Sequence, residues 1–192
     1  MLTLAPPTLR RFTVEEYHAM AEAGVLSRDV RTELIDGLIL EMSPFSPPHV
    51  AVVNRLNRML IQALGEAAVV SVQNSVRLDD GTEPEPDLAV LRSDTPETRI
   101  PEARDALLVV EVSESTEAYD RGIKMARYAA AGIPEAWIIL PTQRRAEIYR
   151  QPGPAEYAEM RVLDRDGDLS ILMLPEAPSL RLVDALPAET DD

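Results

Sequence analysis

The chain has 192 residues, of which 45% are apolar and 27% charged, so it is long enough for one domain with a hydrophobic core of its own. Cysteine is absent, which excludes disulfides, thiolate zinc sites and a cysteine nucleophile, and fits a reducing cytoplasm. The formal net charge of −14 argues against tight, non-specific DNA binding by this chain alone, because phosphate contacts normally use Lys and Arg.

Residues 1–13 lack the basic region and the long apolar core of a secretory signal. No segment of the sequence approaches the apolar length that a transmembrane helix needs. We therefore expect a cytoplasmic protein without a membrane partner.

The first two predicted elements are a helix and a hairpin. Thr13 is a good N-cap and Glu16 stands three residues later, so a capping box predicts a short helix over residues 13–23. Two alternating apolar runs in residues 31–42 flank an Asp-Gly pair, which is favoured in type I′ turns. These residues predict a β-hairpin with Glu33 in its first arm.

A long helix and three strands follow. Residues 47–65 predict the helix, because apolar side chains recur at helical spacing and Gly65 ends the run. The recurring positions are Val50, Val53, Leu56, Leu60 and Leu64. Residues 68–78 and 88–91 are expected to be strands, and residues 106–112 form a nearly continuous apolar run, typical of a strand covered on both faces.

The rest of the chain predicts one more helix and further strands. Residues 115–131 carry apolar positions at helical spacing, and residues 135–140 are again strand-like. A strand, a helix and a strand in this order favour a βαβ unit. A β meander is expected within residues 145–183, with strands at 145–150, 156–161 and 169–172, and residues 187–192 are an acidic tail.

Together these elements indicate a central mixed β-sheet flanked by helices, which is an α/β or α+β domain. Prolines and glycines punctuate the elements, and the sequence contains no internal repeat and no linker that would divide it. We therefore expect residues 1–192 to fold as a single domain.

Two carboxylates stand within the predicted strands. Asp87 precedes the strand at 88–91 and Glu111 lies in the strand at 106–112, where an unpaired carboxylate would be costly. If these strands are neighbours, both side chains can reach one Mg²⁺ ion, which prefers oxygen ligands. Lys124 on the following helix can reach back to stabilise charge or orient a water.

Each of these residues also has a structural interpretation. Asp87 follows a proline and could simply start a strand, and Glu111 could pair with an arginine such as Arg127. Lys124 and Glu33, taken alone, could be solvated surface residues. Spacing by itself leaves these alternatives open.

Two further polar residues are weaker candidates. Gln73 could approach the site from the strand before Asp87, but a half-exposed strand position is the favoured interpretation. His49 could face a substrate phosphate, although a cap or structural role is favoured. Basic residues on the two main helices could form a positive rim or an ordinary charged surface, and these are Arg55, Arg58, Arg121, Lys124 and Arg127.

Five segments carry a family resemblance, in this order: ELIDG, an SP that precedes a histidine, PEPDLAV, LVVEVSEST and DRGIKMARYAAAGIPEAWII. Over residues 12–150 the chain resembles a large bacterial family of short restriction endonuclease-like proteins within the PD-(D/E)xK nuclease superfamily. The resemblance implies a restriction-endonuclease-like core. It also implies that Asp87, Glu111 and Glu33 bind metal.

One position departs from the superfamily pattern. The residue two after Glu111 is Ser113, where the superfamily motif has lysine. The resemblance implies that Lys124 supplies this charge from the helix, so that it completes a catalytic group with Glu111, Asp87 and Glu33.

We therefore expect a magnesium-dependent endodeoxyribonuclease, with manganese as an alternative ion, that hydrolyses DNA by attack of a metal-activated water on phosphorus. RNA is the less favoured substrate. A homodimer is expected, because cutting both strands of a duplex needs two active sites. The alternatives are a catalytically degenerate fold that serves as an interaction or oligomerisation module, which the acidic charge favours, and a hydrolase of a small phosphate ester.

Overall fold

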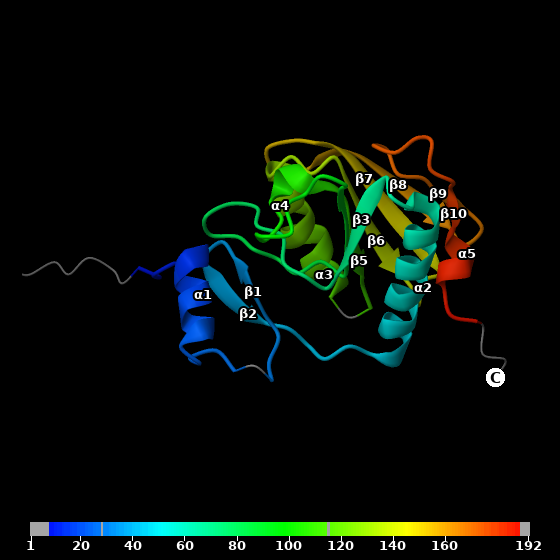
Figure 1. The fold of residues 1–192 in the computed structure, drawn as a ribbon. Coiled ribbons are helices and arrows are strands. Elements are labelled where there is room, and N and C mark those ends of the chain that lie inside the picture. The colour runs from blue at the N-terminus through cyan, green and yellow to red at the C-terminus, as the bar shows by residue number, and fades with distance from the viewer. Residues whose placement is uncertain (1–7, 28, 115, 189–192) are drawn as a thin grey trace, which may run out of the picture.

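A computed structural model describes residues 8–27, 29–114 and 116–188, and Figure 1 shows its fold. A six-stranded sheet forms the centre, helices cover both of its faces, and the N-terminal helix and hairpin lie to one side. The expected mixed α/β architecture is confirmed. Within the described ranges, no helix has both the length and the apolar composition needed to cross a membrane.

The N-terminal elements form as the sequence predicts. Helix α1 spans Val14–Glu22, and Thr13 and Glu16 close a capping box at its start. Strands β1 (Thr32–Ile35) and β2 (Leu38–Glu41) pair antiparallel around the Asp-Gly turn. The two turn residues have positive φ angles of 51° and 73°, as a type I′ turn requires.

Helix α2 spans Pro47–Leu64 and packs its apolar face on the sheet. The side chain of Ser46 caps its N-terminus, and Gly65, with a φ of 51°, ends it. Val52 is buried in this interface, whereas Val50, which the sequence pattern places there, is exposed. Helical spacing thus predicted the helix but misjudged one position of its buried face.

The central sheet has the strand order β3-β4-β5-β6-β7-β8, and its pairs are antiparallel except for the parallel pair β5–β6. Its strands are β3 (Ala68–Val72), β4 (Leu88–Arg92), β5 (Ala106–Val112), β6 (Glu135–Leu140), β7 (Arg145–Pro152) and β8 (Tyr157–Asp164). All seven residues of β5 are buried, which confirms that both faces of this strand are covered. The short 3₁₀-helix η1 (Ala103–Asp105) leads into β5.

The connection from β5 to the parallel strand β6 is helical but is not one regular helix. It consists of α3 (Glu117–Tyr119), the π-helical turn η2 (Asp120–Lys124) and α4 (Met125–Ala130). The βαβ unit is confirmed, whereas a regular helix over residues 115–131 is wrong at its centre, and Ser115 lies outside the described residues. π-Helical turns often occur at functional sites, and this one carries Lys124.

Two helical layers bury the two faces of the sheet (Figure 1). On one face, α2 and the short helix α5 (Leu182–Ala185) share a core with Trp137 and Ile139. On the other face, α4 shares a core with Ile138 and Val109. Consecutive residues of β6 therefore enter different cores, as strand geometry requires.

The strand expected at residues 68–78 is wrong in its second half. It ends at Val72, and Gln73 after it has a positive φ of 51°, which breaks the extended backbone. The amide of Asn74 then donates to the carbonyl oxygen of Val72 at 2.9 Å. Asparagine in a turn commonly bonds to nearby backbone in this way.

The third strand of the expected meander lies outside the main sheet. Strand β9 (Asp168–Leu169) pairs instead with β10 (Leu180–Arg181) in a separate two-stranded sheet. Leu169 is buried in the core beneath α2, so the chain turns inward there instead of continuing along the edge of the sheet. Residues 189–192 of the expected tail lie outside the described residues.

Candidate functional site

A cavity of about 100 Å³ opens between the central sheet, the hairpin and the turn η2. Six carboxylates line it, namely Glu33, Glu85, Asp87, Glu111, Glu114 and Asp120. Arg31 and Lys124 line it as well, together with His49. All four residues that the sequence analysis selects, Asp87, Glu111, Lys124 and Glu33, therefore lie at one cavity, and its lining is strongly negative.

Asp87 and Glu111 meet because β4 and β5 are antiparallel neighbours. Leu88, directly after Asp87, pairs with Val110, directly before Glu111. Asp87 Oδ2 accepts a hydrogen bond from the backbone N–H of Val112 at 2.8 Å, which holds the carboxylate across the end of β5. Both carboxylates are buried and line the same cavity.

Lys124 reaches this cavity from the π-helical turn. Its Nζ atom donates to Glu33 Oε1 at 2.9 Å and to Glu111 Oε1 at 3.1 Å. The lysine is 2% exposed, so its ammonium group bridges two carboxylates away from water. The interpretation of Lys124 and Glu33 as solvated surface residues is therefore wrong.

Lys124 is the only lysine in the sequence. Every other residue counted in its Lys and Arg total is an arginine. Ser113, at the position where the superfamily motif has lysine, is buried, and its backbone N–H donates to Ile139 O at 2.8 Å. The single lysine of the sequence thus supplies the ammonium beside Glu111. Its uniqueness is a signal that the sequence analysis missed.

Glu33 keeps one buried oxygen unpaired. Its Oε1 atom accepts from Lys124 and from the backbone N–H of Glu85, whereas its Oε2 atom has no hydrogen-bond partner among the described residues. A buried acceptor without a partner costs roughly 1–3 kcal/mol. A bound cation would supply that partner.

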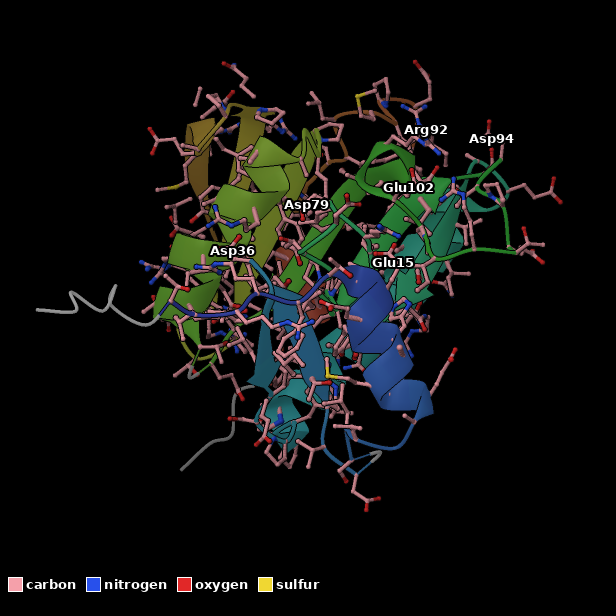
Figure 2. The ribbon with its side chains drawn as sticks, turned by 90° about the vertical axis from the view of Figure 1, so that its left-hand side faces the viewer. Glu15, Asp36, Asp79, Arg92, Asp94 and Glu102 are labelled. Atoms are coloured by element: carbon pink, nitrogen blue, oxygen red, sulfur yellow. The ribbon has the colours of Figure 1, made fainter. Side chains whose placement is uncertain are left out.

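Glu111 is held by Lys124 and Tyr128, so the expected alternative of a pair with Arg127 is wrong. The hydroxyl of Tyr128 donates to Glu111 Oε1 at 2.6 Å. Arg127 instead forms a bidentate pair with Asp36, at 2.6 and 2.5 Å, and Figure 2 labels this aspartate at the hairpin turn. That pair ties α4 to the hairpin.

A stacked row of side chains forms one wall of the cavity. His49 Nε2 lies 2.9 Å from Asp87 Oδ1, and its ring stacks on Phe45 with 4.6 Å between the ring centroids. The guanidinium of Arg31 lies over the same ring, 3.9 Å from its centroid, and pairs with Glu85 at 2.6 Å. The wall orients Asp87 and adds a guanidinium cation to the acidic lining.

The sequence analysis missed Asp120, and of the two roles that it favoured for His49, a helix cap or a structural role, the cap is wrong. Asp120 is buried, lines the cavity and accepts a hydrogen bond from Thr116 Oγ1 at 2.6 Å. The available signal was an acid four residues before Lys124 on the same expected helix. His49 does not cap α2, because the side chain of Ser46 does.

The other weaker candidates lie apart from the cavity. Gln73 meets Asp87 only through its backbone, since its N–H donates to the carbonyl oxygen of Asp87 at 3.1 Å. Arg121 pairs with Glu147 and Glu117. Lys124 is the one residue of this basic set that lines the cavity, since Arg55, Arg58, Arg121 and Arg127 do not, so the set does not form a positive rim around it.

Burial and crowding shift the protonation of the cavity. Burial raises the pKa of Glu111 well above its ordinary value, Lys124 lowers it, and the charges of Asp120, Asp87 and Glu33 raise it again. Burial alone would lower the pKa of Lys124, but the surrounding carboxylates outweigh burial and raise that pKa. Lys124 is therefore protonated, and the carboxylates that line the cavity outnumber the positive charge that it supplies.

The donor set fits a divalent cation in its chemistry and charge. Carboxylate oxygens are hard ligands of the kind that Mg²⁺ and Mn²⁺ prefer. A cation in this cavity would give the unpaired oxygen of Glu33 a partner and would offset part of the negative charge of the lining. Across the described ranges, no group of three or more His, Asp or Glu side chains is gathered closely enough to hold a metal ion, and the ammonium of Lys124 lies between Glu33 and Glu111.

The family model Uma2, described as "Putative restriction endonuclease", matches residues 14–183. The chain belongs to this family. The crystal structure of "a putative nuclease belonging to DUF820" from Anabaena variabilis is similar in fold, with a TM-score of 0.70 and 15% sequence identity over 91% of this chain and 97% of that chain. No curated protein matches the chain.

The resemblance stated from the sequence is thereby confirmed, as is the fold class. The Uma2 match extends beyond the five segments that carried the resemblance and reaches residue 183. The strands β7 and β8 and the small β9–β10 sheet are therefore parts of the Uma2 fold as well.

Proposed function

We propose that this Uma2 protein is a metal-dependent endonuclease that hydrolyses DNA phosphodiester bonds. The observation that supports this most is the contact of Lys124 Nζ with both Glu33 and Glu111 in a buried cavity that Asp87 also lines. A lysine that only stabilises the fold needs one or two carboxylates, whereas six line this cavity. The surplus of acids supports a catalytic use of the site.

In this proposal Asp87, Glu111 and Glu33 would hold a magnesium or manganese ion after drawing closer together, because among the described residues no three acids lie close enough to hold one as they stand. When bound, such an ion lowers the pKa of a water molecule and polarises a phosphoryl oxygen. The backbone N–H of Val112 and the ring of His49 hold the two oxygens of Asp87, so this carboxylate is oriented before substrate arrives.

Lys124 is proposed to stabilise the negative charge that develops on the phosphate, or to position the attacking water. Its raised pKa keeps it protonated at neutral pH. To approach a phosphate, the ammonium has only to give up one of its two carboxylates, because the other keeps it in place.

The acidic lining supports dependence on a metal ion. Six carboxylates outnumber the two permanently charged cations, Arg31 and Lys124, so an approaching phosphate would be repelled unless bound cations offset the charge. DNA is the proposed substrate because the family description names restriction endonucleases. RNA and small phosphate esters are alternatives that the same assay can separate.

The test is cleavage of supercoiled plasmid by the full chain, with and without Mg²⁺ or Mn²⁺, beside Asp87→Ala and Asp94→Ala. Asp94 is a matched control, because it is an exposed aspartate in the turn after β4 and does not line the cavity (Figure 2). We expect metal-dependent cutting by the wild-type protein and by Asp94→Ala. For Asp87→Ala we expect a loss of at least ~100-fold.

Metal binding is measured separately as the change in Tm on addition of Mg²⁺ or Mn²⁺. We expect a rise for the wild-type protein that Asp87→Ala reduces. No cutting together with no metal-induced rise would contradict the proposal and favour an interaction module. Turnover of a small phosphate ester without plasmid cleavage would favour the small-ester hydrolase.

A further inference from the structure

The middle of strand β8 carries exposed apolar side chains on one face, which Asp164 ends, and two charged side chains on the other, between the buried Tyr157 and the half-buried Leu163. Met160 and Val162 are 53% and 48% exposed, and Ala158 on the same face is exposed as well. Glu159 and Arg161 alternate with them and therefore point to the opposite face. None of these residues lines the acidic cavity, so the proposed function gives them no role.

One long side of β8 is an open edge of the sheet. The strand order ends at β8, whose ladder partner is β7. Among the described residues, backbone hydrogen bonds outside that ladder reach β8 only at its end, where the N–H of Gly167 donates to the carbonyl oxygen of Asp164. An eight-residue edge with free N–H and C=O groups is a template for another strand.

We propose that β8 pairs antiparallel with β8 of a second copy of this chain, about a two-fold axis at Met160. In this register Met160 faces the partner's Met160, and Val162 faces the partner's Ala158. On the opposite face Glu159 faces the partner's Arg161, and the symmetry repeats this ion pair. One face of the paired strands then carries a row of apolar side chains, and the other face carries two opposite-charge pairs.

Charge selects this register over its neighbours. A two-fold axis perpendicular to the sheet keeps every side chain on its own face, so moving the axis by one residue shifts the pairing by two. An axis at Glu159 would oppose two glutamates, and an axis at Arg161 would oppose two arginines. Like charges directly opposite each other destabilise a strand pair, whereas opposite charges stabilise it.

The two charged groups are available for this pairing. Within the part of the chain that the structure describes, Arg161 forms no ion pair, and Glu159 accepts from the exposed amide of Gln151 at 3.2 Å. At the ends of the paired strands, Asp164 would face the partner's Glu156, and the symmetry repeats this like-charge pair. Glu156 precedes the first residue of β8, so these two pairs lie beyond the strand ladder, whereas the two pairs of Glu159 with Arg161 lie at its centre.

The pairing joins two six-stranded sheets into one and removes the free edge of each. A joint made by single edge strands lies at the low end of interface sizes, below about 1,200 Å², so we expect a dimer that depends on protein concentration. Such a dimer would bring two active sites together, but the inference stands on β8 alone and does not rest on the proposed function.

Sedimentation equilibrium of the full chain, from about 1 μM to about 1 mM, tests the proposal. We expect a reversible dimer, and we expect Glu159→Arg and Arg161→Glu each to weaken it by roughly tenfold or more. The double variant Glu159→Arg/Arg161→Glu restores opposite charges across the axis and should recover the dimer. Asp94→Arg, which changes net charge as much as Glu159→Arg does, should leave the dimer unchanged.

A monomer over the whole concentration range would overturn the proposal, and so would a dimer that both single variants leave intact. Far-UV circular dichroism verifies that each variant folds. Recovery in the double variant separates charge pairing from a folding defect, because a second charge reversal would not repair a misfolded strand. Plasmid cleavage is measured independently, so failure of the dimer leaves the proposed function untouched.

Discussion

The ammonium of Lys124 lies 2.9 Å from Oε1 of Glu33, a residue 91 positions earlier in the chain. The same ammonium contacts Glu111, and all three residues are buried. Removing one partner of a buried ion pair strongly destabilises the folded protein, because the remaining charge is buried without a counter-charge. The contact therefore couples the stability of the fold to the composition of the site.

Lys124→Met is expected to lower the free energy of unfolding by about 3–5 kcal/mol, measured by urea denaturation, because it leaves the carboxylates of Glu33 and Glu111 without their ammonium. It should also abolish plasmid cleavage. The Mg²⁺-induced rise in Tm should be larger than in the wild-type protein, since the carboxylates then have no other buried cation. An equal or smaller rise would show that the metal ion and the lysine do not share these carboxylates.

His49→Gln is expected to raise the Mg²⁺ concentration needed for cleavage by about 10–100-fold, because it removes one of the two groups that orient Asp87. The backbone N–H of Val112 still holds the other oxygen, so the free energy of unfolding should change by only about 1 kcal/mol. The matched control is His18→Gln, the other histidine, which pairs with Glu83. Equal effects of the two substitutions would contradict a role for the imidazole at the cavity.

The site residues that could be predicted from the sequence are the acids that stand within or beside an apolar strand. Glu111 lies in a run whose strand bounds match the structure residue for residue. Asp87 follows from the same reasoning, because antiparallel neighbours bring the end of one strand to the start of the other. A carboxylate in a buried strand is costly unless it is paired or binds a ligand, so its presence in the sequence already indicates a specific role.

The parts that could not be predicted depend on backbone details that residue patterns do not encode. The π-helical turn at Asp120–Lys124 interrupts the regular helix that the pattern of residues 115–131 predicts, and nothing in that pattern signals the interruption. The positive φ of Gln73 likewise ended a strand that its alternating pattern continued.

Glu147 on β7 gives a prediction for pH dependence. Arg121 donates to its two oxygens at 2.9 and 2.7 Å, and the hydroxyl of Tyr149 donates at 2.8 Å. Burial alone would raise the pKa of Glu147, but these bonds outweigh burial and lower the pKa below its ordinary value. A lowered pKa in the folded state stabilises the fold above the unfolded pKa, and this contribution is lost as pH falls through the folded pKa.

Glu147→Gln should therefore lower the free energy of unfolding by about 1–2 kcal/mol at pH 7, a value reduced by solvent screening because Arg121 is 34% exposed. The difference from the wild-type protein should shrink once the pH falls below about 4, since the unfolded carboxylate titrates near 4.3. Urea denaturation at pH 7, 4 and 3 measures this. A difference that stays constant would show that the ionised form of Glu147 is not what stabilises the fold.

Arg31→Ala is expected to raise the KM for DNA cleavage by roughly tenfold and to change kcat by less than about twofold, because removing a substrate contact made equally in the ground and transition states affects KM alone. Arg31 is the one guanidinium among the described residues that line the cavity, and it lies over Phe45. The salt dependence of DNA binding should also weaken, by about one in the slope of log K against log salt.

Arg92→Ala is the control, because Arg92 is an exposed arginine at the end of β4 outside the cavity (Figure 2). A fall in kcat with an unchanged KM would show instead that Arg31 acts by holding Glu85 and Phe45 in place.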